Sequence, residues 1–228
     1  KEKKNTLGIL VVLLSSLCFA IVPSSAKTSL DLGSSLFILL FSRCLIGLVL
    51  LLPFLFFQKE SVYIKKNYVL PVVFSSIVSV SLIAAVYHAI EYINIALGMT
   101  IVYAFPIGIA LITSIRGEEK YSLKEWLSIL MVIFGLFILV YDEMFTGSLY
   151  GIVVCILSFI LMTTFVYTSS KLADSLGSII LNFHINLWSL IFLTISYFIF
   201  FFTLEITNNS IGLIALLFNG LFYILSYT

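Results

Sequence analysis

The segment Gly8-Ile-Leu-Val-Val-Leu-Leu-Ser15 has a counterpart in Gly151-Ile-Val-Val-Cys-Ile-Leu-Ser158, 143 residues farther along the chain. Each copy is followed by a lysine and then by a Gly-Ser pair that opens an apolar run: Lys27 and Gly33, Lys171 and Gly177. Leu, Ile and Val match easily by chance among apolar sequences, so the glycine, serine and lysine positions carry the comparison. They indicate an internal repeat.

The composition is that of a chain whose main solvent is lipid. Of 228 residues, 61% are hydrophobic and 10% are charged, whereas soluble domains average about 45–50% and about 25%. A helix that crosses ~30 Å of hydrocarbon needs about 20 mainly apolar residues. Eight such runs are present: Leu7–Ala26, Ser35–Phe57, Val69–Ile90, Ile95–Ile115, Trp126–Tyr141 (with a start nearer Ser122), Leu149–Ser170, Ser178–Phe202 and Ile211–Thr228. Because none alternates in polarity as barrel strands do, we predict an all-α, polytopic transmembrane helix bundle.

The basic residues are distributed unevenly between the two sets of loops. With eight spans, one face of the membrane receives ten of the 12 Lys and Arg residues. These are Lys1, Lys3, Lys4, Lys59, Lys65, Lys66, Arg116, Lys120, Lys124 and Lys171. The other face receives only Lys27, and Arg43 lies inside a span. The positive-inside rule therefore predicts a cytoplasmic N-terminus in a multi-pass protein of the cytoplasmic (inner or plasma) membrane.

The two copies of the repeat are separated by five spans. Because five is odd, the second copy enters the membrane from the opposite face, and inverted repeats of this kind are typical of secondary transporters. A cleaved signal peptide is the alternative for the first segment, since a basic start and an apolar run precede Ser24-Ser25-Ala26. Recurrence of the same pattern in mid-chain argues against that alternative. A gene duplication in a protein that does not transport remains an alternative explanation of the repeat.

The chain resembles the EamA-like proteins of the drug/metabolite transporter (DMT) superfamily. The residues that carry the resemblance are Tyr87-His-Ala-Ile-Glu-Tyr-Ile-Asn-Ile-Ala-Leu-Gly98 with Pro106, Arg116-Gly-Glu-Glu119, Trp126-Leu, Gly135 and Arg43. The resemblance covers essentially the whole chain and implies two inverted five-helix repeats and export or exchange of a substrate. We therefore expect a first repeat over residues 1–141 and an incomplete second repeat over residues 148–228.

The resemblance implies ten helices, and eight are present. We expect a chain truncated after the eighth transmembrane helix, which is a monomer at full length. If the protein ends at Thr228, completion of the site in a dimer is the alternative.

Two features inside the spans suggest special roles. Arg43 lies about 12 Å into its helix at 1.5 Å per residue, where a charge is costly. It should therefore face the bundle or a wet cavity, as a structural or a cavity charge. Pro106 removes a backbone hydrogen bond to Val102, and a hinge or a plain kink would explain it equally well. Helical spacing further suggests one inward face made by Met99, Tyr103, Pro106, Ala110 and Thr113.

Several spans carry lines of polar side chains at helical spacing. Buried amides need partners in hydrocarbon, so these lines either join helices or line a cavity. The candidates for a substrate cavity are Tyr87, His88, Tyr103, Pro106, Thr164, Tyr167, Asn186, Asn219 and Tyr223. No Asp or Glu lies near the centre of a span, so proton coupling would use a histidine such as His88 or His184, use the missing helices, or not exist.

The function these patterns favour is secondary transport of a small metabolite or drug-like molecule, such as an amino acid or another amphipathic compound. The lipid bilayer and this substrate are the expected partners, and nucleic acid is not. We expect no catalytic residue, cofactor or metal, because no intramembrane catalytic motif is visible and the three cysteines lie in separate apolar runs. The alternative is a non-transporting or lipid-modifying integral membrane protein.

Overall fold

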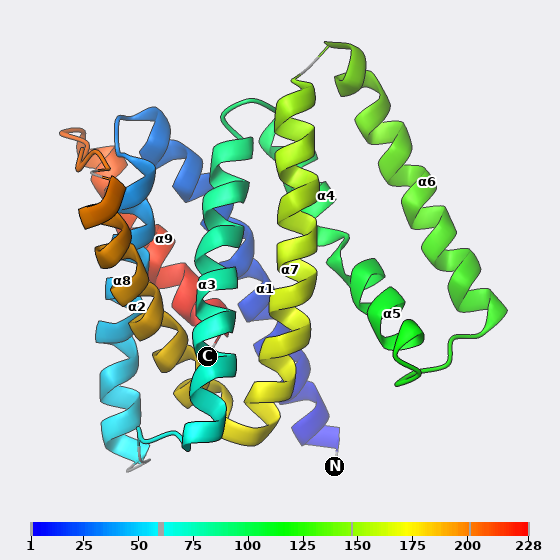
Figure 1. The fold of residues 1–228 in the computed structure, drawn as a ribbon, viewed down its shortest axis with the longest axis horizontal. Coiled ribbons are helices and arrows are strands. Elements are labelled where there is room, and N and C mark those ends of the chain that lie inside the picture. Colours follow the sequence, from blue (N-terminus) through cyan, green and yellow to red (C-terminus); the bar gives the residue numbers. More distant parts are fainter. Residues whose placement is uncertain (1, 59–61, 147, 201, 228) are drawn as a thin grey trace. The chain divides into compact units, whose positions relative to one another are not determined.

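The computed structural model describes residues 2–58, 62–146, 148–200 and 202–227, and over these residues the only regular secondary structure is helical (Figure 1). The helices are α1 (Glu2–Asp31), α2 (Leu36–Gln58), α3 (Lys66–Ala89), α4 (Ile95–Tyr103), α5 (Phe105–Ile115), α6 (Leu123–Thr146), α7 (Leu149–Leu176), α8 (Ser178–Phe200) and α9 (Ser210–Tyr227). The predicted all-α class is confirmed. The end of the eighth predicted span, Thr228, lies outside the described residues.

Six helical stretches are long and apolar enough to cross a membrane. They are Leu13–Asp31, Leu36–Phe57, Lys66–Ala89, Ile95–Ile115, Leu149–Leu176 and Ser178–Phe200. The two remaining predicted spans correspond to α6 and α9, which are also helical. The part of α9 from Ser210 to Ser226 is apolar but shorter than the others. The chain is therefore a multi-pass membrane protein.

The chain divides into two compact units. The first comprises Lys1–Ile77 and Lys171–Thr228, and the second comprises Val78–Ser170. The boundary passes through α3 and α7, so each of these helices contributes to both units. The first unit combines helices from both predicted repeats.

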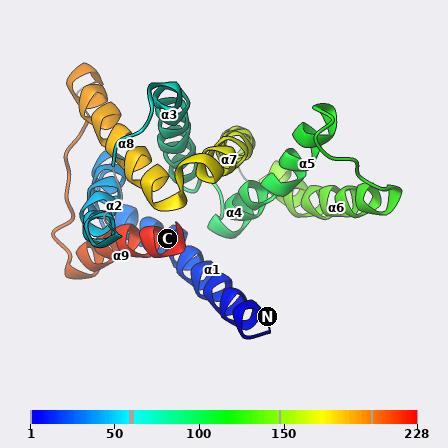
Figure 2. The same ribbon diagram turned by 90° about the horizontal axis from the view of Figure 1, so that it is seen from below.

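In the first unit, α2 lies between α8 and α9, and α9 also packs along α1 (Figure 2). The core of this unit contains Val22 of α1, Leu51 and Leu55 of α2, Phe183 of α8, and Tyr223 and Ile224 of α9. The first two helices of the chain thus share one apolar core with the last two. This is possible because each of these helices carries apolar side chains on every side.

Loop contacts in the first unit show which connections share an end of the bundle. The Thr207 hydroxyl donates to the Leu32 carbonyl at 2.6 Å, and the Ser35 amide donates to the Glu205 carbonyl at 2.8 Å. The α8–α9 connection therefore lies against the α1–α2 turn. The alternation of eight spans predicts this pairing, since both connections belong to the face that receives few basic residues.

Two glycines at matched positions of the repeat end a helix in the same way. Gly33 follows α1 with φ +98° and Gly177 follows α7 with φ +82°. Their amides donate to carbonyls of the last turn, Leu30 at 3.0 Å and Ala173 at 2.8 Å. A left-handed glycine just past a helix is a common stop signal, because glycine has no Cβ to clash.

In the second unit the predicted fourth span is broken into α4 and α5. Ala104 forms the junction, with its amide directed at the carbonyls of Ile101 and Val102, and Pro106 lies in the first turn of α5. The predicted interruption at Pro106 is confirmed. Proline lacks the amide that a continuous helix would need and is accepted in a first turn, where no partner is required.

The start of α6 is fixed by a reciprocal cap. The Ser122 amide donates to Glu125 Oε2 at 2.6 Å, and the Glu125 amide is directed back at the Ser122 hydroxyl at 3.5 Å. This is a Ser-x-x-Glu capping box, and the hydrogen bonds from Ser122 lower the pKa of Glu125. The predicted start near Ser122 is confirmed.

The two matched glycines permit a clean test of backbone strain. No atom lies within 4 Å of a Cβ added at Gly33, Gly177 or Gly135. Gly33→Ala and Gly177→Ala should each destabilise the protein by about 1 kcal/mol, because only the left-handed backbone opposes the methyl group. Gly135→Ala, inside α6, should be neutral or stabilising by roughly 0.5–1 kcal/mol. Thermal unfolding in detergent, followed by circular dichroism, measures all three. Equal shifts for the three variants would contradict the strain argument.

Candidate functional site

Polar side chains gather inside the apolar core of the first unit. Arg43 of α2 is only 6% exposed, Asn186 of α8 is 1% exposed and Asn219 of α9 is fully buried. We use the term polar cluster for the buried set Arg43, Asn182, Asn186, Ser189, Asn219 and Tyr223. The cluster joins three helices of the same compact unit, although its members span 180 residues of sequence.

The charge of the cluster is packed against an aromatic ring. The Arg43 guanidinium carbon lies 3.5 Å from the centroid of the Tyr223 ring. A cation over the face of an aromatic ring gains roughly 0.5–2 kcal/mol, and more of it when water is excluded. The expectation that Arg43 faces the bundle is confirmed by its burial.

The two central amides connect to different neighbours. Asn219 Nδ2 donates to the Val22 carbonyl at 2.9 Å, which links α9 to α1, and Asn186 Nδ2 donates to the Asn182 carbonyl at 2.8 Å. A Cβ added at Gly47 would lie 2.9 Å from Asn186 Oδ1. Gly47 therefore permits the close approach of α2 to this amide.

The cluster also reaches α3. The Ser189 hydroxyl lies 3.4 Å from the Ser76 carbonyl, which is a long hydrogen bond between α8 and α3. On α8, Trp188 Nε1 and His184 Nδ1 are buried without a hydrogen-bond partner among the described residues. The other ring nitrogen of His184, Nε2, lies 2.7 Å from the Val62 carbonyl in the α2–α3 connection.

Among the candidates in the second unit, Tyr87 is 2% exposed and Tyr103 is 37% exposed, and the two side chains interact electrostatically. His88 lies near the end of α3, with Nε2 3.2 Å from the Tyr150 hydroxyl and Nδ1 3.4 Å from Glu91 Oε2. The rings of His88, Tyr92 and Tyr150 pack edge to face. Such an arrangement at a helix end resembles an interfacial aromatic belt.

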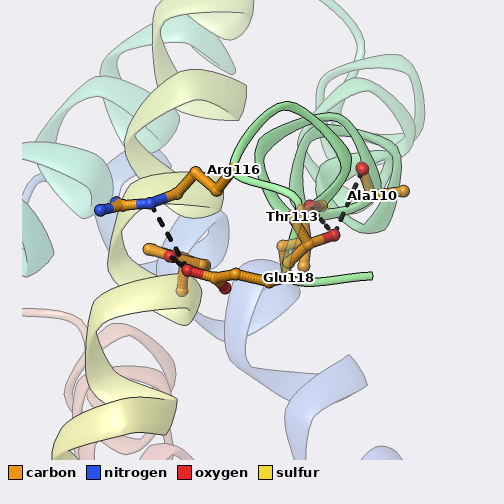
Figure 3. A network of polar contacts seen from close by, with 6 residues as sticks. Ala110, Thr113, Arg116 and Glu118 are labelled. Atoms are coloured by element: carbon orange, nitrogen blue, oxygen red, sulfur yellow. Dashed lines mark hydrogen bonds and ion pairs between the residues drawn. The ribbon is translucent and has the colours of Figure 1, made fainter. Parts of the chain in front are cut away.

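Tyr167 of α7 takes part in a network at the α5–α6 connection. Its hydroxyl donates to Glu118 Oε1 at 2.7 Å, and Arg116 Nε lies 3.4 Å from the same oxygen (Figure 3). Nearby, Tyr121 donates to Glu119 at 2.6 Å, which raises the pKa of Tyr121. The network fastens this connection to α7 within the second unit.

The remaining candidates have local roles. The Thr164 hydroxyl donates to the Ile160 carbonyl of its own helix at 2.9 Å, and Pro106 is exposed. The single inward face suggested for Met99, Tyr103, Pro106, Ala110 and Thr113 stays a prediction. Ala110 and Thr113 are buried, whereas Tyr103 and Pro106 are exposed. The spacing argument assumed one continuous helix, and the break at Ala104 changes the register between the two halves.

Arg43, Asn186, Asn219 and Tyr223 all lie in the first unit, where Arg43 contacts Tyr223 directly, and the other candidates lie in the second unit. Sequence reasoning missed Gly47. Its signal was a glycine in an otherwise apolar helix, one turn after an arginine. Among the described residues, no group of three or more His, Cys, Asp or Glu side chains is arranged to hold a metal ion.

The model of the EamA-like transporter family matches residues 6–141, which is more than half of the chain. No curated protein matches the sequence.

The stack of Arg43 on Tyr223 can be tested by removing the ring. Tyr223→Leu should destabilise the protein by about 1–2 kcal/mol beyond the effect of lost apolar area, because the buried guanidinium loses the ring face. Tyr223→Phe keeps that face and should lose a smaller part. Phe218→Leu, at a 45% exposed position on the same helix, controls for loss of an aromatic ring. Unfolding midpoints in detergent measure the effect, and equal losses for the Tyr223→Leu and Phe218→Leu variants would refute it.

Proposed function

Because this chain belongs to the EamA-like transporter family, we propose that it is a secondary transporter of a small amphipathic metabolite, such as an amino acid. In this proposal the substrate crosses the cytoplasmic membrane by alternating access of two inverted repeats. The chain is a multi-pass membrane protein of a transporter family.

The observation that carries the proposal is the polar cluster. An arginine at mid-helix is expensive in a bilayer, and such residues mark substrate pathways more often than other positions do. Here Arg43 contacts the ring of Tyr223 on α9, and the buried Asn186 and Asn219 lie on α8 and α9 of the same unit. The amides of Asn186 and Asn219 could be explained by helix packing alone. The buried positive charge of Arg43 would in addition attract an anionic group of a substrate.

The chemistry of the cluster favours a substrate with a carboxylate and an apolar part. A guanidinium is planar and presents its donors in the plane, in a fork that matches carboxylate geometry. The Arg43 guanidinium carbon lies 3.5 Å from the centroid of the Tyr223 ring, so the positive charge is held inside the core. The asparagine amides add neutral donors and acceptors, and the surrounding core is apolar. This setting suits an amphipathic metabolite better than a bare phosphate.

Three features support two inverted repeats as the moving parts. The helices α1, α2 and α3 begin at residues 2, 36 and 66, and α7, α8 and α9 begin at 149, 178 and 210, with similar intervals. Gly33 and Gly177 end α1 and α7 with the same left-handed backbone. The family match ends at residue 141, where we expect the first repeat to end. Inverted repeats allow a central site to open to either side by exchange of shapes.

The orientation proposed is N-terminus inside. The ten basic residues on one set of loops against a single lysine on the other support it through the positive-inside rule. The packing of the α8–α9 connection on the α1–α2 turn agrees with the required alternation of loops.

Transport by the full chain in liposomes tests the proposal. Counterflow of radiolabelled neutral and aromatic amino acids should exceed that of empty liposomes. Asn186→Leu and Arg43→Gln should each reduce the rate by about tenfold or more, which corresponds to about 1.4 kcal/mol of lost transition-state stabilisation. The matched control is Thr194→Val, an exposed residue of α8 bonded only to its own helix.

Two results would count against the proposal. A preference for phosphorylated substrates in competition assays would overturn the substrate class while leaving transport intact. Equal transport rates for the Asn186→Leu, Arg43→Gln and Thr194→Val variants would show that the polar cluster does not take part in transport.

A further inference from the structure

A groove lies along the outer side of α2 in the first unit. It has a volume of about 820 Å³ and is lined by side chains between Val49 and Phe57 of α2 and by Val62 of the following connection. Among the described residues, every side chain that lines the groove is apolar. Leu55 forms the buried floor at 3% exposure, whereas Phe56 and Phe57 are 83% and 82% exposed.

The dimensions of the groove match those of a lipid chain in one leaflet. Residues 49–57 span about 12 Å of helix axis at 1.5 Å per residue, and one leaflet accounts for about half of the ~30 Å hydrocarbon core. Pro53 lies in this stretch. Because proline has no amide hydrogen, it cannot donate the helical hydrogen bond to the Val49 carbonyl. α2 nevertheless continues through Pro53 to Gln58, so the groove lies along one continuous helix.

The end of the groove near Val62 is basic. Lys65 and Lys66 follow three and four residues later, and both are exposed. An extended backbone covers at most about 3.6 Å per residue, so the Cα atom of Lys65 lies within about 11 Å of that of Val62. Residues 59–66 contain Lys59, Lys65 and Lys66 against the single acidic residue Glu60, so this connection carries a net positive charge. Tyr63, 74% exposed, adds an interfacial aromatic side chain.

We propose that this groove is a binding site for one anionic phospholipid, with an acyl chain along Val49–Phe57 and the phosphate headgroup at Lys65 and Lys66. A basic patch at the end of transmembrane helices attracts anionic headgroups, and the exposed phenylalanines face the bilayer rather than water. The charge pair makes the site selective for anionic over zwitterionic lipid. The proposal goes beyond transport and depends only on insertion of the chain in a membrane.

Native mass spectrometry of the purified full chain in detergent tests the proposal, with phosphatidylglycerol and phosphatidylcholine of identical acyl chains as the probes. Phosphatidylglycerol should bind more tightly, with one molecule retained preferentially. The variant K65Q/K66Q should lose about fivefold in affinity for each lysine removed, while binding of phosphatidylcholine stays unchanged.

Two control variants make the result specific. K120Q/K124Q removes the same charge from the second compact unit, whereas Lys65 and Lys66 belong to the unit that contains the groove, and it should retain the affinity for phosphatidylglycerol. Leu52→Trp fills the groove and should weaken retention, whereas Ile195→Trp, at an equally exposed position of α8 (53% against 51%), should not. The single variants Lys65→Gln and Lys66→Gln replace the double variant if its helical content falls.

Three outcomes would overturn the proposal. Equal retention of the two lipids would make the groove a non-selective crevice. Equal losses in K65Q/K66Q and K120Q/K124Q would make the binding a general effect of charge. Unchanged retention in Leu52→Trp would place the lipid elsewhere on the protein.

Discussion

The constraint on which the whole structure depends is the satisfaction of polar groups in a medium without water. Hydrocarbon offers no hydrogen-bond partner, so backbone amides and carbonyls must pair within the segment that crosses it. Helices achieve this locally, which explains why the regular secondary structure of the described residues is helical. Many side chains follow the same rule. Ser76, Thr163 and Thr194 each donate to the carbonyl four residues earlier, and so they place no demand on a neighbouring helix.

Against that background, polar side chains that reach across helices stand out. Asn219 donates to a carbonyl of α1, Arg43 stacks on a ring of α9, and Gly47 opens the space that brings α2 to Asn186. Each contact fixes the orientation of one helix relative to another. The rest of the core is apolar and would allow other helix orientations. The same contacts concentrate charge and hydrogen-bonding capacity in the interior of a chain of a transporter family, which is why packing and function are proposed for the same residues.

Breaks in the helices carry the other specific information. The left-handed glycines at 33 and 177 end two long helices at matched positions, and the junction at Ala104 divides a predicted span into two. At such places the backbone departs from the lowest-energy helical course, and the sequence marks them with Gly or Pro. Pro53, by contrast, lies inside the continuous helix α2, where it lines the apolar groove.

From the sequence alone, the helical class, most helix boundaries, the family resemblance and the burial of Arg43 could be predicted, because each follows from local composition, from spacing or from the cost of a charge in lipid. The start of α6 near Ser122 and the interruption at Pro106 were also readable, since capping and proline chemistry act within one turn. The partner of Arg43 and the acceptor of the Asn219 amide were not, because 180 and 197 residues separate the members of these pairs. Spacing also could not predict the difference in exposure between Tyr103 and Ala110, since it assumed a continuous helix where the structure has a junction at Ala104. Which polar side chains meet depends on how apolar helices pack, and apolar surfaces encode that choice only weakly; the tertiary structure decided it.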